Sequence, residues 1–450
     1  MPQPEEELAA ELDLSGATAW SKLHNDLTSQ IIVSFERDGR AEDLPMSKIR
    51  ALAHDADRDV RRRAYEAELE AWERAAVPLA AAMNSIKGQV NTLSARRGWP
   101  SPLDEALWAS HIDRATLDAM LGAVREAFPD LRRYLKAKAR AIGVPTLAWY
   151  DLFAPLGAGA SDGGGNGRVW DFETAQSFIV EQFGSYSERL RDFGRRAFEE
   201  RWIDAEPRAG KTDGAFCMHL RRGESRILAN YSVSYGAVST LAHELGHGYH
   251  NLAEGGLTAV QRRTPMTLAE TASIFCETIV REAALEQGSP AEQLEILEGS
   301  LQDNVQVTLD TLSRFLFESR VFERRREREL SIDELCELML ETQRETYGDG
   351  LDQDTLHPYM WAVKPHYYSQ HSFYNYPYTF GLLFGLGLYA QYGSDPERFR
   401  AGYDELLAST GSSGAAELGD RFGIDVRSSD FWHGSLASVV AGIDRFESLV

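Results

Sequence analysis

Three residues near the middle of the chain have the types and spacing of a catalytic metal site. His243, Glu244 and His247 form a His-Glu-x-x-His pattern, in a stretch whose apolar residues recur at helical spacing. Residues four apart share one face of a helix, so both imidazoles can reach a single ion with Glu244 beside it. The alternative is a pair of core histidines whose hydrogen bonds are satisfied, and we favour the metal site.

A third ligand must come from another segment, because a catalytic zinc ion takes three protein ligands and keeps one position open for water. Glu270 and Glu277 lie two turns apart on a predicted helix with mostly apolar neighbours. A carboxylate at an apolar helix interface is costly unless it is paired or bound to metal. We therefore predict Glu270 as the ligand and Glu277 as a hydrogen-bond partner of a ligand imidazole, the alternative being two surface carboxylates.

Such a site suggests hydrolysis. A zinc ion lowers the pKa of a bound water and polarises a carbonyl group. Glu244 would then serve as the general base that takes the proton of the water and passes it to a leaving amine. Manganese and cobalt also accept histidine and carboxylate ligands, so the ligand set alone leaves the metal open.

A second cluster of polar aromatic residues follows downstream. The segment 364–378 contains two His and five Tyr residues, a density found nowhere else in the chain. Peptide hydrolysis generates an oxyanion, and neutral Tyr or His donors near that charge would lower the barrier. The alternative is that these rings simply pack around a helix start and a loop.

Helical patterns dominate the elements that must position these residues. Apolar residues recur every three or four positions over 18–142 and again from 237 almost to the end. Segments 213–219 and 226–234 have the short apolar runs of strands and predict a small hairpin or edge sheet. Asn230 and Tyr231 would lie on that edge, where free backbone groups could pair with an extended peptide; the alternative is an ordinary strand packed on the helix.

A Gly-, Ala- and Ser-rich segment at 156–167 lacks apolar periodicity and predicts a surface connection. We take it as the boundary between an N-terminal helical lobe, 1–155, and a catalytic lobe, 156–450. A loop within one domain is the alternative. The fold class is mainly α, with a minor sheet beside the motif helix.

Composition excludes several classes of protein. A formal net charge of −22 disfavours nucleic acid and anionic membranes as partners and suits small or cationic substrates. Three widely spaced cysteines indicate a reducing compartment rather than a disulfide framework. The acidic N-terminus lacks the features of a signal peptide, and no apolar run approaches bilayer length, so we expect a soluble, cytoplasmic protein.

Three separated segments, 240–250, 268–277 and 373–381, resemble motifs of the oligoendopeptidase F family, among the thimet-oligopeptidase-like zinc metallopeptidases. Shorter matches at 57–61, 150–155, 214–217 and 227–231 extend the resemblance along essentially the whole chain.

The resemblance implies a two-lobed helical ellipsoid with a deep central channel, one zinc ion and cleavage of short unstructured peptides. By matched position, it implies His243, His247 and Glu270 as zinc ligands and Glu244 as the base. It also implies that His366, Tyr376 and Tyr378 lie opposite the metal as oxyanion donors, with His371 as the alternative histidine.

Family members carry a further N-terminal region that forms part of one channel wall. We expect that a shorter wall would widen the cleft and relax the limit on substrate length. Two other activities remain open: a zinc carboxypeptidase or dipeptidyl carboxypeptidase, and a non-catalytic peptide-binding protein of the same fold. Side-chain specificity and oligomeric state are not predicted.

Overall fold

The computed structural model describes residues 1–37, 39–156, 168–212, 214–221, 223–369 and 371–450. Most of these residues are helical, which confirms the predicted fold class. No helix within the described ranges is both long and apolar enough to cross a membrane. The predicted lobe connection falls almost entirely on 157–167, outside the described residues.

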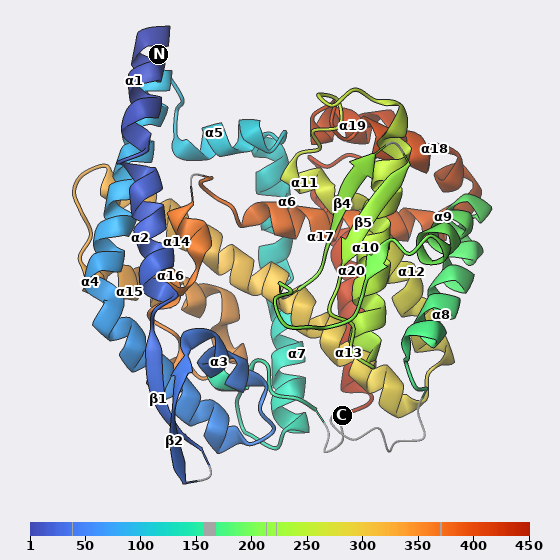
Figure 1. Ribbon diagram of the computed structural model, residues 1–450, viewed down its shortest axis with the longest axis horizontal. Helices are drawn as coiled ribbons and strands as arrows, with labels where there is room; N and C mark the ends of the chain where they lie inside the picture. Colours follow the sequence, from blue (N-terminus) through green and yellow to red (C-terminus); the bar gives the residue numbers. More distant parts are fainter. Residues whose placement is uncertain (38, 157–167, 213, 222, 370) are drawn as a thin grey trace.

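The N-terminal part combines long helices with a hairpin (Figure 1). It contains α1 (Gln3–Asp13), α2 (Ala17–Thr28), β1 (Ile32–Arg37), β2 (Arg40–Pro45), α3 (Met46–Ala51) and the 40-residue α4 (Arg58–Arg97). The hairpin corrects the expectation of continuous helices over 18–142. Val33 and Phe35 alternate inward, and Gly39 has a φ of 73°, a left-handed conformation that suits a tight turn.

The other helices follow in chain order. They are α5 (Pro102–Ala109), α6 (Arg114–Glu126), α7 (Phe128–Ala141), α8 (Phe172–Tyr186), α9 (Glu188–Glu199), α10 (Tyr235–Ala253), α11 (Met266–Ala269), α12 (Thr271–Gln287), α13 (Pro290–Val305), α14 (Thr311–Arg325), α15 (Ile332–Tyr347), α16 (Met360–Val363), α17 (Tyr376–Ser394), α18 (Pro396–Ser409), α19 (Ala415–Arg421) and α20 (Ser429–Glu447).

Buried apolar side chains form two clusters. The smaller one joins α4 to α14, α15 and α16, which Figure 1 shows beside the N-terminal helices. The larger one joins α6 and α7 to α8–α13, α17 and α20. Helix α14 contributes Phe317 to the first cluster and Phe315 to the second, so it connects the two cores. The division of the chain at residue 155 stays a prediction.

A three-stranded sheet lies beside the helix that carries the motif. It consists of β3 (Ile203–Asp204), β4 (Phe216–Arg221) and β5 (Glu224–Leu228) in the order β3-β5-β4. Helix α10 packs on β4 and β5, as Figure 1 shows, which confirms the predicted small sheet beside the motif helix. However, β5 is the central strand and ends at Leu228, before Asn230 and Tyr231.

Candidate metal centre

The two motif histidines of α10 converge with Glu270, which lies at the turn between α11 and α12. Nε2 of His243 lies 3.2 Å from Oε2 of Glu270, and Nε2 of His247 lies 3.4 Å from the same oxygen. One donor atom from each residue falls within 4.8 Å of the other two. Two imidazoles and one carboxylate are the donor set of a catalytic zinc site, so these residues fit the implied metal.

Two glycines allow the close helix packing behind this convergence. A Cβ added at Gly246, between the histidines, would lie 2.6 Å from the carbonyl oxygen of Ala272 in α12. A Cβ at Gly381 in α17 would lie 2.9 Å from the Cβ of Glu270. The absence of a side chain at both positions lets α12 and its preceding residue approach α10 and α17 closely.

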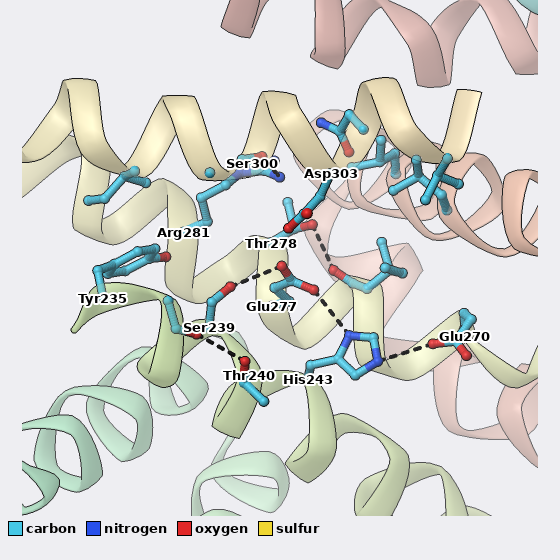
Figure 2. Close-up of a pocket in the computed structure, with 18 of the residues that line it drawn as sticks. Tyr235, Ser239, Thr240, His243, Glu270, Glu277, Thr278, Arg281, Ser300 and Asp303 are labelled. Carbon is cyan, nitrogen blue, oxygen red and sulfur yellow. Dashed lines mark hydrogen bonds and ion pairs between the residues drawn. The ribbon is translucent and has the colours of Figure 1, made fainter. Parts of the chain in front are cut away.

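Glu277 holds the first histidine in place. Nδ1 of His243 donates to Oε2 of Glu277 at 3.1 Å, and the Ser239 hydroxyl donates to Oε1 at 2.9 Å (Figure 2). The Nδ1 bond leaves Nε2 directed at Glu270, the arrangement that orients a metal-binding imidazole. Burial opposes protonation of His243, but the bonds to Glu270 and Glu277 outweigh it and raise the pKa of this imidazole to about 10.

Glu244 lies beside the ligands with one unpaired oxygen. Its side chain is 6% exposed, and Oε2 is buried without a hydrogen-bond partner in the described residues. The backbone amide of Cys217 in β4 donates to the carboxylate. Burial raises the pKa of Glu244, outweighing the opposing influence of the two histidines. A carboxylate with raised proton affinity and a free oxygen can accept a proton from a nearby water.

His366 and Tyr378 form part of an aromatic group near the ligands. Tyr378 lines the same pocket as His243 and Glu270, and its ring centre lies 6.1 Å from that of His366. Tyr374, which sequence reasoning did not select, packs against both rings, with its centre 5.3 Å from that of His366 and 5.6 Å from that of Tyr378. The neutral form of His366 is favoured, because burial, assisted by the charges of Arg314 and Lys364, lowers its pKa to about 4.

Tyr376 is not brought to this group. Its hydroxyl donates to the carbonyl of Ala106 at 3.1 Å and contacts the Ser110 hydroxyl at 2.9 Å, and the side chain is 1% exposed. Tyr376 and Tyr378 are two residues apart at the start of α17, so they point roughly 200° apart around the helix. The geometry therefore does not support an oxyanion role for Tyr376.

The alternative histidine, His371, is exposed and lines a different pocket with Tyr374 and Pro377. It does not line the pocket that contains His243 and Glu270.

Asn230 and Tyr231 lie outside the ladder, and the predicted edge-strand position is wrong. The Asn230 amide donates to the carbonyls of Thr212 and Gly214, and the Tyr231 hydroxyl donates to that of Trp170. The two-residue strand β3 covers the flank of β5 that the prediction left free, so β3 and β4 are the two edges of the sheet and β5 is its centre. Both residues line a small pocket with Thr240 from α10.

Figure 2 shows the pocket that extends from His243 and Glu270. It has a volume of about 660 Å³ and is lined mainly by residues of α10, α12, α13 and α17. Asp303 and Arg281 also line it, and sequence reasoning assigned neither of them a role. The metal ligands were found by their spacing, whereas Asp303 comes from α13, a helix with no recognisable motif.

Comparisons with solved structures confirm the fold. A crystal structure of a protein from Chlamydophila abortus superimposes with a TM-score of 0.87 at 21% identity, covering 100% of this chain and 75% of that one. Oligoendopeptidase-F from Enterococcus faecium superimposes with a TM-score of 0.75 at 18% identity, covering 96% of this chain and 71% of that one.

Sequence relatives confirm the resemblance. An oligoendopeptidase F homologue from Lactococcus lactis subsp. lactis is 25% identical over 89% of this chain and 66% of its own length. Oligopeptidase PepF from Bacillus subtilis is 22% identical over 98% of this chain and 65% of its own. The chain thus spans slightly less than two thirds of these relatives. The model of peptidase family M3 matches residues 175–438, which include all three metal-site residues and Glu244, and the chain belongs to that family.

Proposed function

We propose that this protein is a zinc-dependent endopeptidase that hydrolyses short, unstructured oligopeptides. The observation that carries the proposal is the convergence of His243, His247 and Glu270 beside a buried Glu244 with an unpaired oxygen. Membership of peptidase family M3 and the relatives named oligoendopeptidase F support the same reaction. Zinc is proposed from the ligand set, and a cytoplasmic location is proposed from the sequence.

A bound zinc ion would supply a Lewis acid that polarises the scissile carbonyl and acidifies water. Glu244 would accept the proton of the attacking water, since its free oxygen faces no competing donor and burial raises its pKa. The protonated Glu244 would then deliver this proton to the leaving amine. Glu277 would keep Nδ1 of His243 engaged throughout, so that Nε2 remains available to the metal.

His366 and Tyr378 are the proposed oxyanion donors. Burial raises the pKa of the Tyr378 phenol, so its hydroxyl stays protonated at neutral pH. His366 stays neutral there and retains one N–H for donation. Donors that face the developing charge from the side opposite the metal would stabilise the transition state more than the bound peptide.

The decisive experiment compares Glu244→Gln with His243→Ala, using an internally quenched peptide and metal analysis of the purified proteins. We expect Glu244→Gln to lose turnover while it keeps zinc, and His243→Ala to lose both. Normal turnover by Glu244→Gln would refute the base assignment. Peptide binding without cleavage by the zinc-loaded wild-type protein would instead favour a non-catalytic peptide-binding function.

Analysis of the product ends separates the proposed endopeptidase from a carboxypeptidase or dipeptidyl carboxypeptidase. A blocked peptide, acetylated at one end and amidated at the other, offers no free terminus to an exopeptidase. Internal cleavage of such a peptide supports the endopeptidase proposal. Release of single residues or dipeptides from free C-termini alone would contradict it.

A further inference from the structure

The pocket beside the metal ligands continues well beyond them. From His243 and Glu270 it extends between α12 and α13, as Figure 2 shows. Its walls include five aliphatic side chains: Ile274, Ile296, Val307, Leu382 and Leu386. A side chain next to the cleaved bond of a peptide could therefore enter it and place methylene groups against these walls.

Asp303 lies within this pocket without a partner. Figure 2 shows its carboxylate directed from α13 toward Glu277 and Thr278. No hydrogen bond or ion pair joins it to another described residue. Asp303 is exposed to the pocket, but the surrounding protein partly desolvates its carboxylate, and this desolvation, with a smaller contribution from Glu277, raises its pKa to about 6. At neutral pH Asp303 is therefore mainly ionised.

The other charges leave the pocket negative. Glu277 is engaged by His243 and Ser239. Arg281 would be the natural site for an anion, but its guanidinium already donates to Glu282 at 2.9 Å and to Ser300 at 3.1 Å. Glu295 adds a second exposed carboxylate to the lining, and no ion pair joins it to any residue that the structure describes. With Arg281 neutralised by Glu282, the free charge in the pocket is anionic.

A buried tyrosine at the start of α10 forms part of the pocket wall. Tyr235 is only 7% exposed, and its hydroxyl makes no well-aligned hydrogen bond within the described part of the chain. Figure 2 shows the ring extending from the start of α10 into the space between Ser239 and Arg281. Because the hydroxyl itself has almost no accessible surface and lies next to Ser239, Tyr235 contributes to the pocket wall and not to a contact with the substrate.

We propose that this pocket selects a lysine or arginine side chain at a residue flanking the cleaved bond, with Asp303 as its ion partner. The inference rests on the proposed peptidase function and specifies its substrate class. The aliphatic stem of a basic residue would pack on the isoleucine and leucine walls, and its cationic end would reach the free carboxylate. The net charge of −22 would further attract cationic peptides.

The test uses the zinc-loaded protein and blocked, internally quenched peptides. These differ at one flanking position, which carries lysine, its neutral analogue norleucine, or glutamate, and mass spectrometry locates the cut. We expect kcat/KM for lysine to exceed that for norleucine by about 10-fold or more on one side of the bond. Asp303→Asn should remove this preference and change norleucine cleavage by less than about 2-fold.

Two further variants sharpen the result. Asp303→Lys should reverse the preference toward glutamate. Glu286→Gln makes the same charge change on α12 at an exposed residue outside the pocket and should leave the lysine preference intact. Equal cleavage of lysine and norleucine peptides by the wild-type protein, or an unchanged preference in Asp303→Asn, would overturn the inference while leaving the peptidase function standing.

A free peptide amino terminus is the other possible source of the cation. Peptides without basic side chains therefore enter the series in both free and acetylated forms. If the free forms are cleaved faster and lysine gives no advantage, Asp303 recognises a terminus and the lysine proposal is overturned. Failure to cleave any peptide would overturn the proposed function and this inference together.

Discussion

Glu277 lies 3.1 Å from Nδ1 of His243, a residue 34 positions earlier on a different helix. The carboxylate is held on its other side by Ser239, four positions before His243 on α10. This contact connects α10 to α12 at the metal centre. It also determines which imidazole nitrogen faces Glu270. The orientation of the first ligand therefore depends on a residue that would not itself contact the ion.

Replacing Glu277 should weaken metal binding. Glu277→Ala removes the acceptor of the Nδ1 hydrogen, so the imidazole of His243 can rotate and loses basicity. We expect zinc affinity to fall by about 10- to 100-fold. Competition with a chromogenic chelator measures this directly, without any assay of activity. Glu286→Ala, an exposed change on the same helix, is the matched control and should bind zinc as the wild type does; equal affinities for both variants would contradict the role of Glu277.

Gly246→Ala should destabilise the protein. The added methyl group would lie 2.6 Å from the Ala272 carbonyl oxygen and from the Cα of Ser273, both backbone atoms that cannot move independently of α12. We expect a loss of about 1–3 kcal/mol in the free energy of unfolding, together with weaker zinc binding because Glu270 shifts away from the histidines.

Gly122→Ala in α6 is the control for Gly246→Ala. Nothing lies within 4 Å of a Cβ at that helical position, so the change should stabilise the protein by about 0.5–1 kcal/mol. Urea unfolding of the metal-free variants measures both effects. A Gly246→Ala variant as stable as the Gly122→Ala variant would show that the helices separate without cost.

The metal centre was predictable because its information is local. His243 and His247 are four residues apart and therefore lie on one face of a helix. Glu270 is recognisable as a carboxylate in a mostly apolar stretch. The strand order was not predictable, because β3 contains only Ile203–Asp204 and has no alternating pattern to detect. That short strand occupies the flank of β5, and this is why Asn230 and Tyr231 are not on a free edge.

The aromatic segment illustrates a different limit. Its density of Tyr and His indicated a functional cluster, but the choice between residues depends on where α17 begins. Because the helix starts at Tyr376, this residue and Tyr378 face different parts of the protein. Asp303 lay beyond sequence reasoning for another reason. Its position beside Glu277 depends on how α13 packs on α12, which no local pattern encodes.

The two tyrosines should therefore behave differently. Tyr378→Phe removes a donor from the pocket of the metal ligands, and we expect kcat to fall by about 100- to 1000-fold with little change in zinc content. Tyr376→Phe removes a hydroxyl that contacts α5 and should lower stability by about 1 kcal/mol while kcat remains close to wild type. Steady-state kinetics of both zinc-loaded variants tests which tyrosine is the oxyanion donor. A larger loss of kcat in Tyr376→Phe would restore the assignment based on the family motif.

The preference for lysine should depend on pH in one direction. Because the pKa of Asp303 is raised to about 6, its carboxylate is ionised above that pH and neutral below it. The other charged or titratable groups that line its pocket are Glu277 and Arg281 on α12, Glu270 just before α12, Glu295 on α13, Tyr235 and His243 on α10, and Tyr378 on α17. Lysine stays cationic throughout this range, so only the enzyme side of the pair titrates.

We expect the ratio of kcat/KM for lysine over norleucine peptides to be constant above about pH 7, to be half lost near pH 6 and to approach unity toward pH 5. The ratio cancels the pH dependence that comes from Glu244 and the metal ligands, because cleavage of both peptides requires these groups equally. In Asp303→Asn the ratio should stay near unity at every pH. A wild-type ratio that is flat from pH 5 to pH 8, or that rises as the pH falls, would mean that the selecting charge does not reside on Asp303, since a carboxylate attracts a cation only when it has lost its proton.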